Sequence, residues 1–526
     1  MRTSVCLAAI ILALSSCGEN RGGGDGGNGV AAVQPSRVDP ALLREAVTDE
    51  RARRFYEARQ WQPAWSEETA EALVQAIGGA ANHGLNKELF LADAAQAEEP
   101  AAREAALTLA ALAYAEALAR GRVDPERVRD IYEIARPEFD AAVALNQGLE
   151  QADLAAWFDG LAPQDAEYRA LSQAYVRAAQ NAGQGQRPPI APGKAIRPGA
   201  NDERLPAVVA ALRLDGYLAP APAPSRGQEA QAEKAKSSQP AAAPPTRYSP
   251  ELVEAVRRLQ QDHGLEPSGI IGEETLAALN GGAFERARTL AVNLERRRWL
   301  VRQPPATRID VNTAGAVLSY WRDGQLANQR RVVVGQPGNE TPALGSPMFR
   351  LVANPTWTVP RSIQTEEIEP KGAAYMARNN MTWKDGYIVQ GSGPKNSLGL
   401  VKFDMKNDHA IYLHDTPAKA LFQQSDRHQS HGCVRVDDAL GFARMIAADQ
   451  GVTDAWERAQ ATGEETFVPL RREIPVRLLY HTAFVDGGRV MFRDDAYGWD
   501  EDVAEALGLA RRDRRPTRAH VPDVGP

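Results

Sequence analysis

The chain has 526 residues, too many for one hydrophobic core, and this length predicts three or four domains of ordinary size. A hydrophobic content of 43% and a charged content of 25% are typical of soluble globular proteins. The formal net charge is -7, and Lys and Arg are interspersed with Asp and Glu, so the composition argues against nucleic acid as a partner.

The N-terminus has the pattern of a bacterial lipoprotein signal. After a short positive start, residues 5–14 (VCLAAIILAL) have the length of a signal h-region and are too short to span a bilayer. The following LSSC resembles a lipobox, which implies that residues 1–16 are removed and that Cys17 receives a lipid. Because Gly18 rather than Asp follows Cys17, the resemblance to lipoproteins implies a periplasmic protein that is anchored to the outer membrane. The alternative is a plain secretory signal with an incidental cysteine.

One cysteine then remains as a free thiol. Residues 17–38 are Gly-rich and are expected to form a flexible tether. Cys6 leaves with the signal and Cys17 carries the lipid, so Cys433 is the free thiol of the mature chain. In an oxidising compartment, an unpaired thiol is either buried and inert or kept for its reactivity.

Residues 39–200 are expected to form a helical scaffold domain. Ala and Leu recur at helical spacing in ALLREAV, ETAEALVQAIGGA, REAALTLAALAYAEALARG and YRALSQAYVRAAQ. Gly84 and Gly121 stand where helix C-caps are expected. Residues 181–200 are rich in Pro and Gly and are typical of a linker.

A smaller helical unit is predicted over residues 201–283. RLPAVVAALRLDGYL reads as one amphipathic helix, and YSPELVEAVRRLQQDHGLEPSGIIGEETLAAL reads as a helical hairpin with Ser249 as N-cap and Pro250 in the first turn. The low-complexity residues 219–247 are expected to be a disordered insertion. The pattern resembles the three-helix peptidoglycan-binding domain. The alternative is a helical spacer that has lost binding.

In the second half of the chain the hydrophobic period changes to two. Strands are predicted in TRIDVNT, AVLSYWRDGQLANQRRVVVG, MFRLVANPTWTVP, GYIVQ and AIYLHD. Asp323-Gly324 predicts a hairpin turn, and PVRLLYHTAFVDGGRVMFRDD predicts a second hairpin. We therefore expect a mainly β domain over residues 306–485, followed by a hairpin strand and tail over residues 486–526. The fold class is multidomain α+β.

The free thiol stands beside four histidines in HAIYLHDTPAKALFQQSDRHQSHGCVR. A thiolate is a strong nucleophile, and a nearby imidazole can generate it by taking the thiol proton. His414 ends an alternating apolar strand, and SHGCVRV predicts a tight turn into another strand, so adjacent strands would bring His414 to Cys433. Amides at Gly432 and Cys433 are suited to an oxyanion, and Arg435 to a substrate carboxylate or carbonyl.

Two alternatives stay open on these residues alone. Histidine and cysteine are admissible zinc ligands, although the sequence contains no CxxC or HExxH motif and the spacing of His431 and Cys433 is tight for one ion. The histidines could also be purely structural, which is the usual role of a lone histidine. The nucleophile hypothesis itself requires no metal and no cofactor.

His414, followed after fifteen residues by SHGCVR, resembles the signature of L,D-transpeptidases, whose catalytic domain is called YkuD-like. The family usually has Asn where Arg435 stands, and a subgroup of large Gram-negative members has Arg there. NPTWTVP, GPKNSLGLVKF, YLHDTP, RFYEARQWQPAWSEE and EALARGRVDP also resemble that subgroup. The resemblance therefore covers nearly the whole mature chain.

The resemblance implies a role for each residue of the signature. Cys433 is the acyl-accepting nucleophile, His414 is the general base, and the backbone carbonyl of Asp415 orients the imidazole. The oxyanion and substrate site is implied to be formed by Ser430, His431, Gly432 and Arg435.

The resemblance also implies a capping subdomain over residues 355–405. Trp357, Trp383 and Tyr387 are lid candidates, with simple packing as the alternative role.

The implied reaction joins two peptidoglycan stems. The thiol takes the acyl group of a tetrapeptide donor, and a diaminopimelate amine of the acceptor stem releases it as a 3→3 cross-link. Carbapenems acylate the same thiol in this family. Water as acceptor would give an L,D-carboxypeptidase, and a protein lysine would give an anchoring enzyme. A third class is a non-catalytic peptidoglycan-binding lipoprotein.

Overall fold

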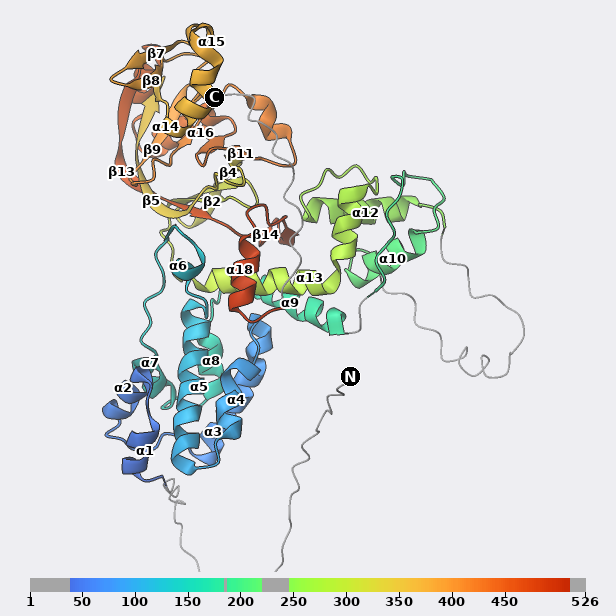
Figure 1. Ribbon diagram of the computed structural model, residues 1–526, viewed down its shortest axis with the longest axis vertical. Coiled ribbons are helices and arrows are strands. Elements are labelled where there is room, and N and C mark those ends of the chain that lie inside the picture. Colours follow the sequence, from blue (N-terminus) through green and yellow to red (C-terminus); the bar gives the residue numbers. More distant parts are fainter. Residues whose placement is uncertain (1–37, 184–186, 220–245, 511–526) are drawn as a thin grey trace, which may run out of the picture.

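The computed structural model describes residues 38–183, 187–219 and 246–510. The predicted signal peptide, nearly all of the tether and of the low-complexity insertion, and the end of the C-terminal tail lie outside these ranges. The described residues form three lobes that meet at the long helix α13 (Glu273–Arg298), as Figure 1 shows. The predicted α+β multidomain class is confirmed.

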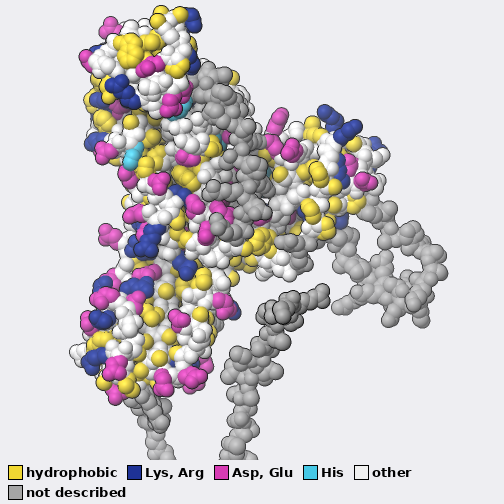
Figure 2. All heavy atoms as spheres, in the orientation of Figure 1, with side chains coloured by type: hydrophobic (Ala, Val, Ile, Leu, Met, Phe, Trp, Pro, Cys, Tyr) yellow, Lys and Arg dark blue, Asp and Glu magenta, His cyan; other side chains and the backbone are white. Residues whose placement is uncertain are grey.

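The surface of the three lobes is mixed in charge. Lys and Arg side chains alternate with Asp and Glu over the face that Figure 2 shows. None of the helices within the described ranges is both long and apolar enough to cross a bilayer.

The helical lobe (residues 38–183) is built around α5 (Pro100–Arg120), whose buried face is largely alanine and leucine and lets its neighbours approach closely. Gly84 (φ 69°) and Gly121 (φ 87°) cap helix ends in left-handed or extended positive-φ conformations, as predicted. The other helices are α1 (Pro40–Ala46), α2 (Glu50–Ala58), α3 (Glu67–Gly78), η1 (Gly79–His83), α4 (Glu88–Gln96), α6 (Pro125–Val128), α7 (Ala141–Gly148), α8 (Leu154–Leu161) and α9 (Ala166–Gly183).

The three-helix unit contains α10 (Leu205–Leu214), α12 (Pro250–Asp262) and the first part of α13. The Ser249 hydroxyl accepts the Leu252 N–H, so the predicted N-cap is present. The linker prediction is wrong for residues 187–200. Ile190 and Ile196 in this stretch are 3% and 2% exposed in the core of the unit, because apolar side chains in a Pro- and Gly-rich segment still gain by burial.

Helix α13 belongs to two lobes. Gly282 (φ 65°, ψ -175°) breaks the helical geometry, and the helix then continues into the helical lobe. Beyond the kink, Leu290 and Leu294 are buried in the core of that lobe. The sequence analysis assigned no element to this second half of the helix.

The barrel lobe is a sheet closed on itself, because β9 pairs with β5 as well as with β10. The turn at Asp323-Gly324 has φ values of 51° and 81°, as a two-residue hairpin requires. The strands are β2 (Arg308–Asn312), β3 (Val317–Arg322), β4 (Gln325–Gly335), β5 (Ala343–Ala353), β9 (Val401–Met405), β10 (Leu413–His414), β11 (His428–Ser430), β12 (Val434–Val436) and β13 (Thr466–Leu479). Helices in this lobe are η4 (Lys419–Gln423), α16 (Ala439–Asp449) and α17 (Thr453–Ala461).

The barrel also takes a strand from the helical lobe. Strand β1 (Tyr132–Glu133) pairs in parallel with the first residues of β5. The predicted boundary between scaffold and catalytic domain is therefore crossed by a backbone pairing.

A capping insertion stands over one end of the barrel, with its own small apolar core that includes Trp357, Ile368 and Ile388. It lies between β5 and β9, so the end of the predicted 355–405 range is wrong: β9 pairs with β5 as a barrel strand, and its Val401 and Phe403 are buried in the barrel core. Its elements are β6 (Trp357–Thr358), α14 (Arg361–Ile363), η2 (Gln364–Ile368), η3 (Glu369–Lys371), α15 (Gly372–Arg378), β7 (Met381–Lys384) and β8 (Tyr387–Gln390).

The C-terminal segment (residues 480–510) returns to the helices. Strands β14 (Ala483–Asp486) and β15 (Arg489–Phe492) form the predicted hairpin as a separate two-stranded sheet. It is followed by α18 (Trp499–Ala506), whose Val503 lies in the core of the helical lobe. A domain boundary between residues 485 and 486 would therefore cut through strand β14 of this hairpin.

Candidate active site

Strands β10 and β12 bring the predicted base to the predicted nucleophile. They pair in parallel, with Leu413 opposite Val434 and His414 opposite Arg435. Leu413 and Val434 are fully buried in the barrel core. Because side chains alternate along a strand, His414 and Arg435 face the other way, out of the barrel.

Tyr412 directly precedes β10, and Cys433 directly precedes β12. The Val434 N–H donates to the Tyr412 carbonyl oxygen over 3.1 Å, which holds the two segments side by side. The Cys433 Sγ lies 3.7 Å from the Ala410 carbonyl oxygen, and its side chain is half-buried. The free thiol thus stands at the edge of the barrel and not inside its core.

The imidazole of His414 is buried and oriented by the backbone. Its Nδ1 lies 2.5 Å from the Asp415 carbonyl oxygen, a contact in which the nitrogen must donate. Nε2 then carries the lone pair and can accept a proton. Burial, followed by the positive charge of Arg435, lowers the pKa of His414 to about 3, so the imidazole is neutral at physiological pH.

Burial also raises the pKa of the Cys433 thiol above its ordinary value. Hydrogen bonds from Tyr412 and the positive charges of Lys402 and Arg435 act in the opposite direction and only partly offset burial. The resting site therefore holds a thiol and a neutral imidazole, and no preformed ion pair.

Tyr412 is a site residue that the sequence analysis missed. Its hydroxyl is hydrogen-bonded to the Cys433 thiol and to the indole N–H of Trp357, and burial raises its pKa well above the usual range. The tyrosine therefore stays a neutral donor. Its contacts depend on the pairing of distant segments, so no local pattern in the sequence pointed to it.

The turn before the thiol is held by its own polar groups. The Ser430 hydroxyl donates to the Cys433 carbonyl over 2.5 Å and accepts the Gly432 N–H over 3.2 Å. Gly432 has φ 109°, a conformation that favours glycine. Among the described residues, the Cys433 N–H has no acceptor, so it is available to an oxyanion.

His431 connects the turn to the capping insertion. Its Nε2 lies 2.6 Å from a carboxylate oxygen of Glu367, which belongs to η2 of the cap. This places the imidazole at the joint between cap and barrel. Its predicted part in the oxyanion site stays a prediction.

The three lid candidates lie in different surroundings. Trp357 is 5% exposed in the small core of the cap and reaches Tyr412. Trp383 and Tyr387 are 55% and 40% exposed on the β7–β8 hairpin, and the Arg361 guanidinium lies 4.0 Å from the Tyr387 ring centroid. Of the three, only Trp357 is linked to the thiol among the described residues, through the Tyr412 hydroxyl that bonds to both.

The other two histidines have partners of their own. His409 Nε2 lies 2.8 Å from a Glu133 carboxylate oxygen, and His428 Nδ1 lies 2.9 Å from Asp426. In the part of the chain that the structure describes, no three His, Cys, Asp or Glu side chains are grouped to hold a metal ion.

The Asp415 carboxylate supports the loop at the end of the cap. It accepts the Leu400 N–H over 2.9 Å and forms an ion pair with Lys419. A Cβ at Gly399 would lie 2.3 Å from this carboxylate, so the close approach requires glycine. Asp415 thus acts on the site through its backbone carbonyl and on the cap through its side chain.

Comparison with known families decides the nature of the barrel lobe. The model of the L,D-transpeptidase catalytic domain matches residues 306–460, which contain the whole site described above. The chain carries an L,D-transpeptidase catalytic domain. Models of the "Scaffold domain" and of the "Putative peptidoglycan binding domain" match residues 50–213 and 234–279. The predicted resemblance to L,D-transpeptidases with a scaffold domain and a peptidoglycan-binding domain is confirmed.

Individual relatives agree with this domain. Over 219 residues, the chain is 32% identical to a "Putative L,D-transpeptidase" of Haemophilus influenzae, and the match covers 37% of this chain and 45% of that protein. The chain thus spans less than half the length of this curated relative.

Solved transpeptidases are more distant in sequence. One from Stackebrandtia nassauensis has 12% identity and a TM-score of 0.22, over 58% of this chain and 100% of that chain. The Ldtfm-avibactam carbamoyl enzyme has 14% identity and a TM-score of 0.19, over 34% of this chain and 52% of that chain.

Proposed function

We propose that this protein is a peptidoglycan transpeptidase that forms 3→3 cross-links between diaminopimelate residues through a cysteine thioester. The observation that carries the proposal is the placement of His414 on β10 and of Cys433 directly before the paired strand β12, with Tyr412 in contact with both side chains, within a matched catalytic domain. The Asp415 carbonyl gives the imidazole the tautomer that a general base needs.

Acylation is the first step. The Cys433 Sγ attacks the carbonyl carbon between diaminopimelate at stem position three and D-Ala at position four, while the thiol proton moves to His414 Nε2. The tetrahedral oxyanion accepts hydrogen bonds from the free Cys433 N–H and from the Tyr412 hydroxyl. When the C–N bond breaks, the same imidazole proton passes to the departing D-Ala amine, and a thioester remains.

Release of the acyl group is the second step. The side-chain amine of a second diaminopimelate attacks the thioester and gives its proton to His414. The C–S bond then breaks, the sulfur regains a proton from the imidazole, and a new amide joins the two stems. Arg435, buried at the base of this face, is proposed to hold the donor peptide through a carbonyl or carboxylate.

The enzyme is proposed to act in the periplasm from a lipid anchor on the outer membrane, with the three-helix unit contacting the wall. The apolar run and LSSC motif before Cys17 support the anchor. Cys17→Ser is expected to abolish lipid labelling and to release the full chain from the membrane fraction. A labelled, membrane-bound variant would contradict the anchor and leave the catalytic proposal unaffected.

The test of the activity is an analysis of muropeptides after incubation of the purified protein with tetrapeptide stems. We expect cross-linked dimers that lack one D-Ala. Tripeptides without dimers would indicate transfer to water, as in an L,D-carboxypeptidase. Transfer to a lysine of an added wall-associated protein would indicate an anchoring enzyme. The absence of any product with retained wall binding would indicate a binding protein.

The same assay identifies the nucleophile. Cys433→Ala is expected to eliminate both the dimers and the meropenem adduct measured by mass spectrometry, because no other free cysteine lies among the described residues. An adduct that persists in this variant would place the acylated residue elsewhere. Carbapenems are thus proposed as inhibitors that react at the same sulfur.

A further inference from the structure

The loop between β4 and β5 lies directly behind the catalytic turn. It starts at Gly335, where a Cβ would come within 2.2 Å of the Asn339 carbonyl oxygen, so the tight fold of the loop requires glycine. A Cβ at Gly432 would lie 3.6 Å from the Glu340 carbonyl oxygen. The loop backbone is therefore in van der Waals range of the turn that carries the nucleophile.

Thr341 makes the polar connection from this loop to the turn. Its hydroxyl donates to the Gly432 carbonyl over 2.8 Å and accepts the Gly335 N–H over 2.9 Å. The side chain is 1% exposed, so no water competes for these bonds. One buried hydroxyl thus fixes the direction of the Gly432 carbonyl.

The direction of that carbonyl sets the direction of the oxyanion donor. The Gly432–Cys433 peptide is trans, so its C=O and its N–H point in opposite directions. With the carbonyl held by Thr341 at the back, the Cys433 N–H points away from the loop. Gly432 has φ 109° and no side chain, so its own turn preference does little to fix this peptide.

Tyr497 in the C-terminal segment supports Thr341 from behind. The Tyr497 hydroxyl donates to the Gly335 carbonyl over 2.7 Å and lies 3.4 Å from the Thr341 N–H, which it accepts. Together, the two hydroxyls satisfy both ends of the loop. The catalytic turn is therefore connected to a part of the chain that lies outside the matched catalytic domain.

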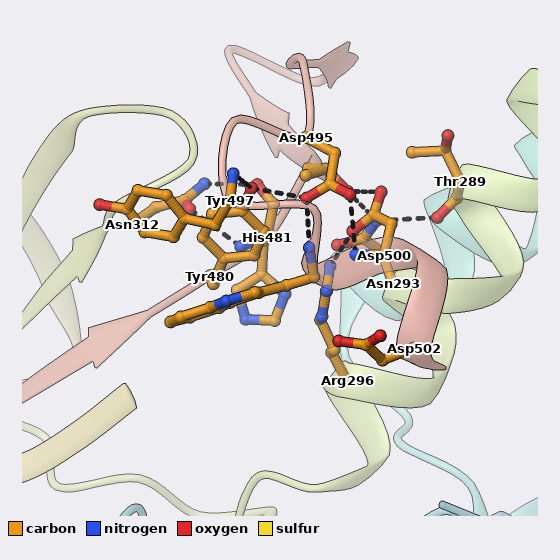
Figure 3. Close-up of polar contacts among 12 residues, drawn as sticks. Thr289, Asn293, Arg296, Asn312, Tyr480, His481, Asp495, Tyr497, Asp500 and Asp502 are labelled. Atoms are coloured by element: carbon orange, nitrogen blue, oxygen red, sulfur yellow. Dashed lines mark hydrogen bonds and ion pairs between the residues drawn. The ribbon is translucent and has the colours of Figure 1, made fainter. Parts of the chain in front are cut away.

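Tyr497 is in turn held by a buried polar network, which Figure 3 shows. Its ring stacks on Tyr480 with 5.0 Å between centroids, and its N–H donates to the Tyr480 hydroxyl. Tyr480 donates to Asp495 over 2.7 Å, and Arg296 of α13 donates to Asp500 over 2.5 Å. The network ties the Tyr497 ring to the helix where the three lobes meet.

We propose that Thr341 is a positioning residue for the oxyanion site, where its hydroxyl aims the Gly432–Cys433 peptide, and that Tyr497 supports it from the C-terminal segment. The inference rests on the proposed transpeptidase function. It adds two residues that touch neither the substrate nor the sulfur.

The test separates two reactions of the same thiol. Acylation by meropenem passes through an oxyanion, whereas alkylation by iodoacetamide needs the thiolate and forms no oxyanion. We expect Thr341→Val to slow acylation about tenfold, as for the loss of one buried hydrogen bond, and to leave alkylation unchanged. Thr341→Ser should restore acylation, and Tyr497→Phe should slow it by about threefold.

The matched control is Thr313→Val. Thr313 is also 1% exposed and donates its hydroxyl to a backbone carbonyl, that of Leu479, over 3.0 Å, but it does not contact the turn. It should leave both reactions at the wild-type rate. Thermal unfolding of all variants monitors the fold.

Each outcome bears on one claim. A Thr341→Val enzyme that acylates at the wild-type rate overturns the inference. Equal slowing of acylation and alkylation also overturns it, because the threonine would then only support the fold. A wild-type protein that forms no adduct at all instead contradicts the proposed function, and the inference falls with it.

Discussion

Cys433 and His414 lie in surroundings that favour the uncharged forms of both side chains. Burial raises the thiol pKa and lowers the imidazole pKa to about 3, so each shift opposes proton transfer between them at rest. In the proposed reaction, the proton therefore moves during attack, when the developing oxyanion and the substrate change the local field. This separates the site from cysteine enzymes that hold a stable thiolate.

This state predicts the pH dependence of alkylation. Because the thiol pKa is raised, less thiolate is present at a given pH, and the iodoacetamide rate should climb about tenfold per pH unit from pH 7 to 8 without a plateau. His414→Gln should keep this profile and lose acyl transfer. A plateau near neutral pH that disappears in His414→Gln would instead show a resting ion pair. Mass spectrometry of the labelled protein measures the alkylation rate of the wild type and of His414→Gln at each pH.

The sequence could supply the nucleophile and the base but not their supporting groups. Spacing and residue type predict Cys433 and His414, since few chemistries need a free thiol beside histidines. Tyr412 and Thr341 are ordinary residues of alternating strands or loops in the sequence. Their roles depend on strand register and on a loop folding back by way of Gly335, and neither is encoded in a local pattern.

At the scale of elements, the joint between cap and barrel is the feature most open to test. The cap has its own apolar core, and the contact between His431 and Glu367 links its η2 helix to the catalytic turn. A charge-assisted contact of this kind, half-exposed, contributes roughly 1 kcal/mol. The cap is therefore expected to open locally at a free energy well below that of global unfolding.

Glu367→Gln tests this joint. The neutral side-chain amide accepts a weaker hydrogen bond than the carboxylate, so we expect exchange of the backbone amide hydrogens in η2 and α15 to become about fivefold faster. Glu366→Gln is the matched control, because Glu366 is the adjacent exposed glutamate in the same helix. Unchanged exchange in Glu367→Gln, or equal acceleration in both variants, would show that the contact does not hold the cap closed.

The periodicity of the sequence predicts the helices and strands, but it does not predict which of them pack or pair with each other. Three features are predicted by local signals and are present in the structure: the hairpin turn at Asp323-Gly324, the hairpin turn at Asp486-Gly487-Gly488, and the helix N-cap at Ser249. Strand β1 pairs with β5, which lies more than two hundred residues later in the chain. Because β1 is only two residues long, no sequence pattern could predict it. The burial of Ile190 and Ile196 likewise depends on a surface made by distant helices.

At the scale of the whole molecule, helix α13 is the common structural element. Before Gly282 it completes the three-helix unit, and beyond the kink it packs in the helical lobe. Arg296 then joins it to the C-terminal segment through Asp500. Helix α13, the buried network and the pairing of β1 with β5 thus connect the three-helix unit and the barrel to the helical lobe.

The burial of Val503 and Leu507 among the first helices has a consequence for biogenesis. The helices near the N-terminus leave the ribosome first, yet Val503 and Leu507, which complete their hydrophobic core, are synthesised almost last. This core cannot be completed step by step during synthesis. A chain that ends near residue 500 would therefore expose part of the N-terminal core to proteases.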